Sequence, residues 1–139
     1  DFPVIAEFEK EISIISFGLE AITDLDFYKK KLAHSYKKEK DGMIVLICND
    51  EIVGWICMAI KTNFITNEKY ANFKSFYIKE NYRGAEYSNL LMESGLDFCR
   101  QSGVKKIVGK VHIKNLAMRA LYKNFNFEPT HITMEYMFN

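Results

Sequence analysis

The sequence predicts an α/β fold, in which a mixed central sheet is flanked by helices in the element order ααβββαβαββ. Before Met43 the apolar side chains recur at helical spacing, and from Met43 onward short β-branched runs alternate with helical segments. The 139 residues are 48% hydrophobic and 14% aromatic, which is enough for one domain with a buried core. The sequence contains no repeat, low-complexity tract or linker, so we expect a single domain over residues 1–139.

The N-terminal segment predicts two helices. Asp1 can cap the first helix, and Pro3 suits its first turn. The apolar residues of this helix recur every three or four positions: Val4, Ile5, Phe8, Ile12 and Ile15. The second helix is expected over roughly Asp24 to Lys38, and it ends in a lysine-rich turn before Asp41-Gly42.

The next segment predicts three strands. "MIVLIC" (43–48) and "EIVGWICMAI" (51–60) are nearly continuous apolar runs that meet at Asn49-Asp50, a pattern typical of a hairpin. Because these runs are apolar on both faces, we expect central strands that are covered on both sides. A third strand is expected near Tyr70 to Lys79.

The C-terminal half predicts two further helices and the remaining strands. One helix runs from about Ala85 to Ser102 and stops at Gly103, a residue suited to ending a helix. "KKIVGKVHI" (105–113) predicts a strand, and "NLAMRALYKNF" (115–125) predicts a helix. The tail "FNFEPTHITMEYMFN" (125–139) predicts one or two closing strands. Three large aromatic side chains are interpreted as core packing rather than as a binding platform: Trp55, Phe98 and Tyr136.

Composition and charge argue against several classes of protein. A formal net charge of +1 gives no reason to expect nucleic acid or an anionic membrane as the partner. Cys48, Cys57 and Cys99 lack the spacing of a disulfide framework or a zinc site, so we expect reduced thiols and no metal. No apolar run reaches the roughly 20 residues of a membrane span. No signal peptide is recognisable either, so we expect a cytoplasmic protein.

The turn between the third strand and the third helix has features of a phosphate site. In "FYIKENYRGAEYSNLL" (76–91) a strand feeds a helix through a tight turn, which leaves the first N–H groups of the helix unpaired. These donors and the helix dipole attract phosphate, while Arg83 adds positive charge and Gly84 adds backbone freedom. Taken alone, the segment is equally consistent with an ordinary strand–turn–helix.

A second motif, "NLAMRALYKNFNF" (115–127), supports the phosphate interpretation. Here the chain resembles the GNAT superfamily of acyl-CoA N-acyltransferases, whose pattern is Asn-x-x-Ala-x-x-Leu-Tyr-x-x-x-Gly-Phe. The pyrophosphate loop of that family, Arg/Gln-x-x-Gly-x-Gly/Ala, falls at the family distance upstream, where "YRGAEYS" stands. "EIVGWICMAI" is also similar to the corresponding strand of the family. The resemblance therefore covers roughly Met43 to the C-terminus.

The chain departs from the family pattern at four motif positions. Glu86 and Ser88 replace the two loop glycines, Met118 replaces an alanine, and Asn126 replaces a glycine. Asn126 is a mild change, because asparagine tolerates the left-handed conformation after a helix. A Glu86 carboxylate about 4 Å from a phosphate charge would be repelled by about 1 kcal/mol in water, and by more at lower dielectric. Family members also begin with an edge strand, so we expect that strand to be missing from this chain or the chain to be a variant.

The resemblance implies an acetyl-CoA-dependent N-acetyltransferase that moves the acetyl group to a primary amine by direct attack. Acetyl-CoA would lie between the strand that ends at Ile78 and the strand that ends near Ile113. Tyr122 would be the general acid that protonates the leaving thiolate, since a phenol has a reference pKa of about 10. The residues implied to bind the cofactor are Phe76, Tyr77, Ile78, Arg83, Gly84, Ala85, Glu86, Tyr87, Ser88 and Asn115.

Within that set the resemblance implies different contacts. Backbone groups of Phe76 and Ile78 would pair with the acyl carbonyl and the pantetheine, and the Phe76 N–H would stabilise the oxyanion. Backbone N–H groups from Arg83 to Ser88 would hold the pyrophosphate. Asn115 would hydrogen-bond the pantetheine arm.

Several points stay open at the level of the sequence. Glu68 and His112 are candidate general bases, and Lys114 and Lys123 are candidate contacts of the coenzyme A phosphates. The acceptor amine is not readable, and the sequence leaves open whether the chain forms a homodimer. The substituted phosphate loop keeps an alternative function open, a catalytically inactive GNAT-fold module that binds or regulates.

Overall fold

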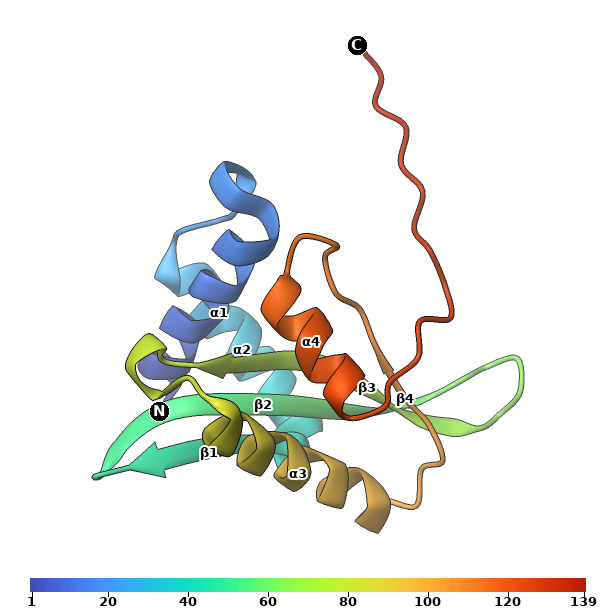
Figure 1. The fold of residues 1–139 in the computed structure, drawn as a ribbon, viewed down its shortest axis with the longest axis horizontal. Helices are drawn as coiled ribbons and strands as arrows, with labels where there is room; N and C mark the ends of the chain where they lie inside the picture. Colours follow the sequence, from blue (N-terminus) through green and yellow to red (C-terminus); the bar gives the residue numbers. More distant parts are fainter.

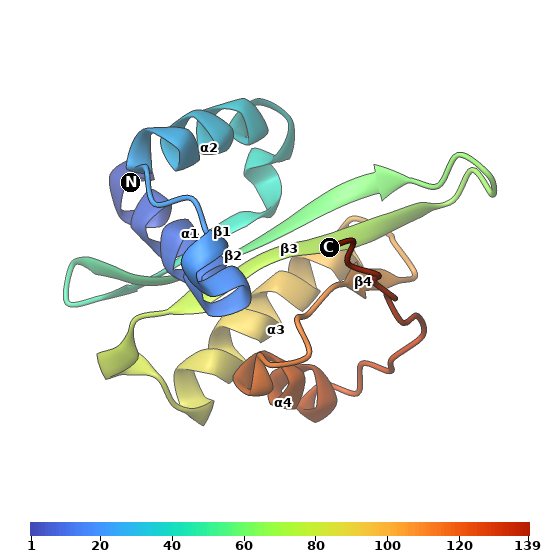
Figure 2. The same ribbon diagram turned by 90° about the horizontal axis from the view of Figure 1, so that it is seen from above.

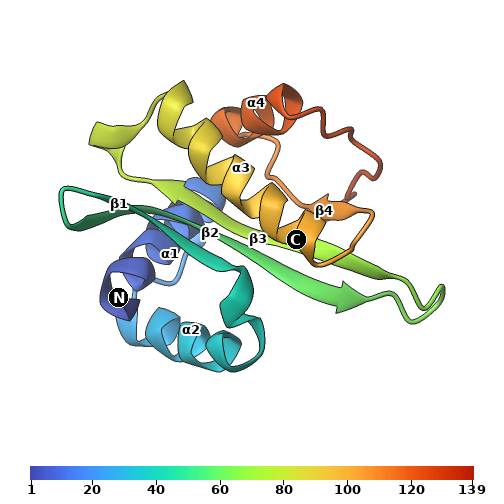
Figure 3. The same ribbon diagram turned by 90° about the horizontal axis from the view of Figure 1, so that it is seen from below.

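The computed structural model describes residues 1–139, with the exception of the Ala85 side chain. One mixed sheet lies between two layers of helices, with α1 and α2 on one face and α3 and α4 on the other (Figures 1 and 2, and from below in Figure 3). The helices are α1 (Phe2–Phe17), α2 (Leu25–Glu39), α3 (Ala85–Gln101) and α4 (Leu116–Asn124). The strands are β1 (Met43–Cys48), β2 (Glu51–Thr62), β3 (Lys69–Ile78) and β4 (Ile107–Gly109). The predicted fold class is confirmed.

The sheet has the strand order β1-β2-β3-β4. β2 pairs antiparallel with both β1 and β3, and β4 pairs parallel with β3. β1 and β2 form the predicted hairpin. Its turn residues Asn49 and Asp50 have φ angles of 51° and 63°, the left-handed conformation that a two-residue hairpin turn needs. All side chains from Val53 to Ala59 are buried, which confirms that β2 is a central strand covered on both faces. The same expectation is wrong for β1, which lies at the edge of the sheet.

Local signals set the helix ends close to where the sequence predicts them. Asp24 caps α2, because its side chain accepts a hydrogen bond from the Asp26 N–H at 3.0 Å. α3 ends before Gly103, whose φ of 75° is the left-handed conformation expected after a helix. Asp1 occupies the N-cap position of α1, but the Ile5 N–H bonds its backbone carbonyl rather than its side chain.

Two apolar clusters hold the helices against the sheet. On the α3 and α4 face, the buried side chains include Ile56, Met58, Phe73, Ile78, Leu91, Met92 and Leu121. On the α1 and α2 face, they are Ile5, Ala6, Phe8, Tyr28, Leu32, Trp55 and Cys57. Full burial of one large apolar side chain contributes roughly 1.5–3 kcal/mol, so both helical layers are fixed by packing rather than by helix propensity.

The prediction for the last strands is wrong. The strand expected over residues 105–113 is limited to Ile107–Gly109, and residues 125–139 form neither helix nor strand. The tail leaves the end of α4 and extends away from the sheet (Figure 1), and Tyr136, which was expected to pack, is 80% exposed. A strand needs a partner for its N–H and C=O groups, and the pairing of β4 with β3 covers only three residues.

Gly42 supplies a test of the packing between the end of α2 and the sheet. A Cβ at this position would lie 1.8 Å from the Met58 carbonyl oxygen, so the backbone has to shift to accept a side chain. We predict that Gly42→Ala lowers the free energy of unfolding by about 2 kcal/mol or more. Gly84→Ala is the matched control, because a Cβ there meets nothing within 4 Å. Chemical denaturation checks the pair, and equal loss in both variants would contradict the packing.

Candidate active site

A bulge in β3 changes the direction of its backbone groups. Ser75 pairs with Cys57 and Phe73 pairs with Met58, so Lys74 is the extra residue of the bulge. Before the bulge, the Ala71 N–H bonds the Lys106 carbonyl on the β4 side at 2.9 Å. After it, the Lys79 N–H bonds the Val53 carbonyl on the β2 side at 2.8 Å. The backbone N–H and C=O groups of the odd-numbered residues of β3 therefore point toward β4 before the bulge and toward β2 after it.

After the bulge, Phe76 and Ile78 direct their backbone N–H and C=O groups away from β2, because these groups alternate in direction along a strand. The Ile78 carbonyl shows this direction, since it accepts a hydrogen bond from Arg83 Nε at 2.8 Å. Tyr77 differs from its two neighbours. It pairs with Trp55 on β2, and its ring packs on Phe8 of α1 with 4.8 Å between the ring centroids.

β3 and β4 separate where the bulge begins. Their pairing ends at Phe73 and Gly109, and beyond this point a cavity of about 80 Å³ lies between residues 73–76 and residues 110–112. We call this cavity the strand opening. Side chains from two helices and a loop complete its wall: Ile12, Ser16, Asn115, Met118 and Tyr122. The structure thus brings Phe76, Asn115 and Tyr122 together, as the sequence predicts.

Tyr122 is packed tightly against the end of β4. A Cβ on Gly109 would lie only 2.0 Å from the Tyr122 hydroxyl oxygen. The Tyr122 ring contacts Phe73 and Phe127, with centroid distances of 5.5 Å and 4.9 Å. Burial raises the pKa of Tyr122 to about 12, so the phenol keeps its proton throughout the physiological pH range.

Gly109 is a residue of the site that the sequence reasoning missed. A glycine inside a strand often marks a point where another group approaches the backbone closely, and this signal was available in "KKIVGKVHI". The partner of that approach was not available, because Gly109 and Tyr122 belong to different elements. Only the packing of α4 against the end of β4 identifies it.

Asn115 begins α4 at the edge of the strand opening. Its side-chain oxygen accepts a hydrogen bond from the Met118 N–H at 3.1 Å and so caps the helix. Because the side-chain oxygen is used in this cap, the side-chain NH₂ group of Asn115 is left to donate a hydrogen bond to a ligand. At the far end of α4, Asn126 has a φ of 63°, which confirms that asparagine here adopts the left-handed conformation of the family glycine.

The predicted phosphate loop forms the start of α3. The Arg83 N–H bonds the Glu80 carbonyl at 3.2 Å, and the Ser88 N–H bonds the Gly84 carbonyl at 3.1 Å. Of the predicted donors these two are already used, which leaves the cradle to the N–H groups of residues 84–87. Glu86 is exposed in the first turn of α3, where the helix dipole favours a negative charge. Its carboxylate stabilises the helix start and also competes with a phosphate for it.

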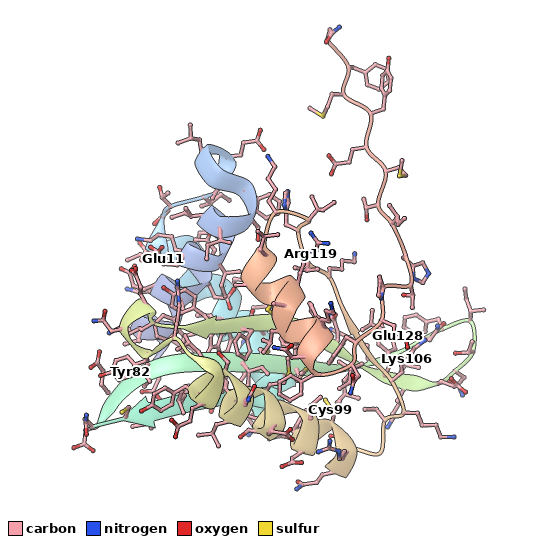
Figure 4. All side chains as sticks on the ribbon, in the orientation of Figure 1. Glu11, Tyr82, Cys99, Lys106, Arg119 and Glu128 are labelled. Atoms are coloured by element: carbon pink, nitrogen blue, oxygen red, sulfur yellow. The ribbon has the colours of Figure 1, made fainter. Side chains whose placement is uncertain are left out.

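Arg83 and Tyr87 turn away from the start of α3. The Arg83 guanidinium lies over the Tyr77 ring, 5.3 Å from its centroid, in addition to its bond with Ile78. The Tyr87 ring contacts Tyr82, which Figure 4 shows beside the loop before α3. The nearby Cys48 thiol raises the pKa of Tyr87. Both side chains thus contact the ends of the strands in this structure.

The two general bases suggested by the sequence do not suit that role. Glu68 precedes Phe76 by eight residues of nearly extended chain, about 25 Å at roughly 3.3 Å per residue. His112 lines the strand opening, but its Nδ1 accepts a hydrogen bond from the Lys114 N–H at 3.1 Å. In the neutral ring the other nitrogen then carries the proton, so His112 presents a donor rather than a proton acceptor. Lys114 and Lys123 are both exposed.

Two kinds of feature are absent from the residues that the structure describes. Within this part of the chain no group of three or more His, Cys, Asp and Glu side chains is arranged to hold a metal ion. Over the same residues, every helix is too short or too polar to cross a membrane.

Comparison with known proteins identifies the family. The sequence model of the Acetyltransferase (GNAT) family matches residues 7–127, so the chain belongs to this family. No curated protein was found to match the chain.

Solved structures share the fold over nearly the whole chain. A possible acetyltransferase from Clostridium difficile 630 superposes with a TM-score of 0.78 at 22% identity, covering 100% of this chain and 92% of that chain. A transcriptional regulator from Bacillus halodurans C-125 gives 0.77 at 15% identity, covering 99% and 93%. An aminoglycoside N-acetyltransferase in complex with CoA gives 0.64 at 12% identity, covering 80% and 87%. At these identities the likeness shows the fold alone.

A double-mutant cycle tests the contact between Gly109 and Tyr122. We predict that Gly109→Ala lowers the free energy of unfolding by about 1–3 kcal/mol, because the new methyl group meets the phenolic oxygen. In a Tyr122→Phe background the same substitution should cost less, since the oxygen is gone while the ring carbons remain. Chemical denaturation of the four proteins measures the coupling. Equal costs in both backgrounds would contradict the contact.

Proposed function

We propose that this protein is an acetyl-CoA-dependent N-acetyltransferase that transfers the acetyl group to a primary amine by direct attack. The observation that carries the proposal is the strand opening, which forms where β3 and β4 separate. Phe76 of β3 and Tyr122 of α4 both line this opening. Membership of the GNAT acetyltransferase family supports the reaction class and the cosubstrate. A cytoplasmic location and a homodimer stay predictions.

The backbone of β3 would supply the oxyanion contact. The Phe76 N–H points away from β2, toward the space that a thioester would occupy, and it is fixed by the pairing of its neighbours with β2. A donor held in this way needs no reorganisation when negative charge develops on the carbonyl oxygen. The Ile78 carbonyl would accept a pantetheine N–H only after Arg83 Nε releases it.

Tyr122 would act as the general acid on the leaving thiolate. A phenol whose pKa is raised to about 12 holds its proton firmly, and a thiolate has an ordinary pKa of about 8.5. Transfer from Tyr122 to sulfur is therefore uphill unless Tyr122 regains a proton at the same time. The nitrogen of the attacking amine must lose a proton as the amide forms, so we infer that Tyr122 passes its proton to sulfur while it receives one from nitrogen.

The start of α3 would hold the pyrophosphate. The N–H groups of residues 84–87 and the helix dipole supply the attraction, and the exposed Glu86 carboxylate opposes it. In water this repulsion is about 1 kcal/mol at 4 Å, which weakens binding about fivefold but does not abolish it. The alternative function, a GNAT-fold module without catalysis, is motivated by Glu86 and Ser88, while Tyr122 and its surroundings favour the enzyme.

The general-acid role predicts a loss of turnover without a loss of affinity. Tyr122→Phe should lower kcat by about 100-fold or more and leave acetyl-CoA binding nearly unchanged, because the ring packing is kept and only the proton donor is removed. Thiol release with a panel of primary amines measures the rate, and calorimetry measures binding. Tyr36→Phe, an exposed tyrosine of α2, is the control. An unchanged rate in Tyr122→Phe would remove Tyr122 from this role.

The repulsion at the phosphate loop predicts tighter binding when the charge is removed. Glu86→Gln and Glu86→Gly should lower the Kd of acetyl-CoA about fivefold at low salt, and the gain should shrink at high salt because the charge is screened. Glu93→Gln is the matched control, since Glu93 is exposed two helical turns further along α3. Calorimetry at two salt concentrations checks the effect. Equal or weaker binding by both Glu86 variants would contradict it.

A further inference from the structure

A second cavity lies beneath α1 and α2, on the other side of the Lys74 bulge. It measures about 80 Å³ and reaches from the two helices down to β2 and β3. Its wall is formed by Glu9, Tyr28, Lys31, Leu32, Ser35, Met43, Trp55, Cys57, Lys74 and Ser75. Lys74 and Ser75 also line the strand opening, so the two cavities meet at the bulge. We call the second cavity the helix cavity.

Two polar atoms of the residues that line the helix cavity are buried and make no hydrogen bond of good geometry. They are Glu9 Oε1 and the indole nitrogen of Trp55, a residue that is only 2% exposed. One is an acceptor and the other a donor, and leaving either group unpaired costs about 1–3 kcal/mol. A cavity of this size holds water, and water can bond both atoms. The helix cavity therefore has room for a water molecule beside these two polar groups.

The charged and titratable groups around Glu9 come from every element packed against it. They are Tyr28 and Lys31 of α2, Cys57 of β2, and Lys74 of β3. The Ser75 hydroxyl and the Trp55 indole also lie close enough to the Glu9 carboxylate to favour its charged form. Lys74 is paired with Glu39 at 2.6 Å, which offsets its charge. Cys57 is neutral, because burial raises its pKa to about 12. Burial is also the largest influence on Glu9 and raises the pKa of its carboxyl above the ordinary value, so that Glu9 binds a proton more readily than an exposed glutamate.

Glu9 is close to the strand opening along α1. Glu9, Ile12 and Ser16 recur at helical spacing on one face of the helix, and Ile12 and Ser16 line the strand opening. Three residues of helix rise about 4.5 Å, so Glu9 lies one turn from the opening. Glu68 is too distant and His112 presents a donor, whereas Glu9 lies one helical turn from the opening and lines a cavity that shares Lys74 and Ser75 with it.

We propose that Glu9 accepts, through water in the helix cavity, the proton that the acceptor ammonium must lose before it attacks. This role rests on the proposed function. The first proton of the ammonium passes to Glu9, and the neutral amine attacks the thioester carbonyl. The second nitrogen proton moves to Tyr122 as Tyr122 protonates the departing sulfur. The three ammonium protons then stand on the amide nitrogen, on the coenzyme A thiol through Tyr122, and on Glu9, which releases its proton to solvent.

The test compares two acceptors that differ in basicity, ethylamine and 2,2,2-trifluoroethylamine. Ethylamine arrives as the ammonium at neutral pH, whereas the fluorinated amine arrives largely unprotonated and needs no base. With thiol release from acetyl-CoA as the readout, Glu9→Gln should lower kcat/KM by about 100-fold for ethylamine and by about tenfold or less for trifluoroethylamine. Glu11→Gln, on the same helix and labelled in Figure 4, is the control and should match the wild type with both amines.

Binding and stability measurements separate the possible failures. Acetyl-CoA binding should be equal in Glu9→Gln and the wild type. A folded-state pKa above that of the unfolded chain makes stability fall as pH rises through the interval between the two values. The Glu9→Gln substitution removes this fall of stability with rising pH. In thermal unfolding at neutral pH the Glu9→Gln protein should therefore be at least as stable as the wild type. A less stable Glu9→Gln protein would mean that the carboxylate is paired and overturns the proposal.

The remaining outcomes are also decisive. Equal rates for Glu9→Gln and Glu11→Gln with ethylamine would overturn the role of Glu9 and leave the proposed function standing. An equal loss of rate with both amines would also overturn this role, because it marks a structural effect. A wild-type protein that binds no acetyl-CoA, or that binds it and releases thiol with none of the primary amines of the panel, would overturn the proposed function and this role with it.

Discussion

The pairing between β3 and β4 stops after three residues, and the candidate site depends on this limit. A parallel pair that continued would bond the N–H and C=O groups of both strands to each other and leave none for a ligand. β4 ends at Gly109, and the Lys74 bulge interrupts the ladder so that Phe76 and Ile78, rather than Ser75 and Tyr77, direct their backbone groups away from β2. Phe76 and Ile78 consequently face an opening instead of a strand. Tyr122 reaches the same point only because Gly109 has no side chain to exclude it.

Burial on both faces of the sheet explains why polar atoms are buried beside the site. β2 is covered by α1 and α2 on one face and by α3 and α4 on the other. A helix layer that covers a sheet must also cover whatever polar groups lie beneath it. Trp55 and Glu9 are such groups, and their unpaired atoms meet in one cavity next to the bulge. The cost of these atoms is offset by the apolar clusters that surround them.

Electrostatics at the start of α3 follow from helix geometry rather than from the loop motif. The first N–H groups of any helix are unpaired, so a phosphate cradle survives the replacement of both motif glycines. Glu86 uses the same dipole for its own stabilisation, typically 0.3–1 kcal/mol, and this sets the scale of its competition with a bound phosphate. Arg83, which the sequence suggests as a phosphate contact, instead binds the end of β3 through Ile78 and Tyr77.

The sequence by itself determined the elements whose signals are local. The start of α2 near Asp24, the hairpin turn at Asn49-Asp50 and the left-handed Gly103 and Asn126 all stand where the residue types predict, because each signal acts within a few residues of itself. The family motifs likewise placed Asn115 and Tyr122 at one site. Only the tertiary structure decided which groups face the opening, that Gly109 accommodates the Tyr122 hydroxyl, and that Glu9 shares a buried cavity with Trp55. It also left the C-terminal segment without strands, because strand formation needs a neighbouring backbone that no local pattern supplies.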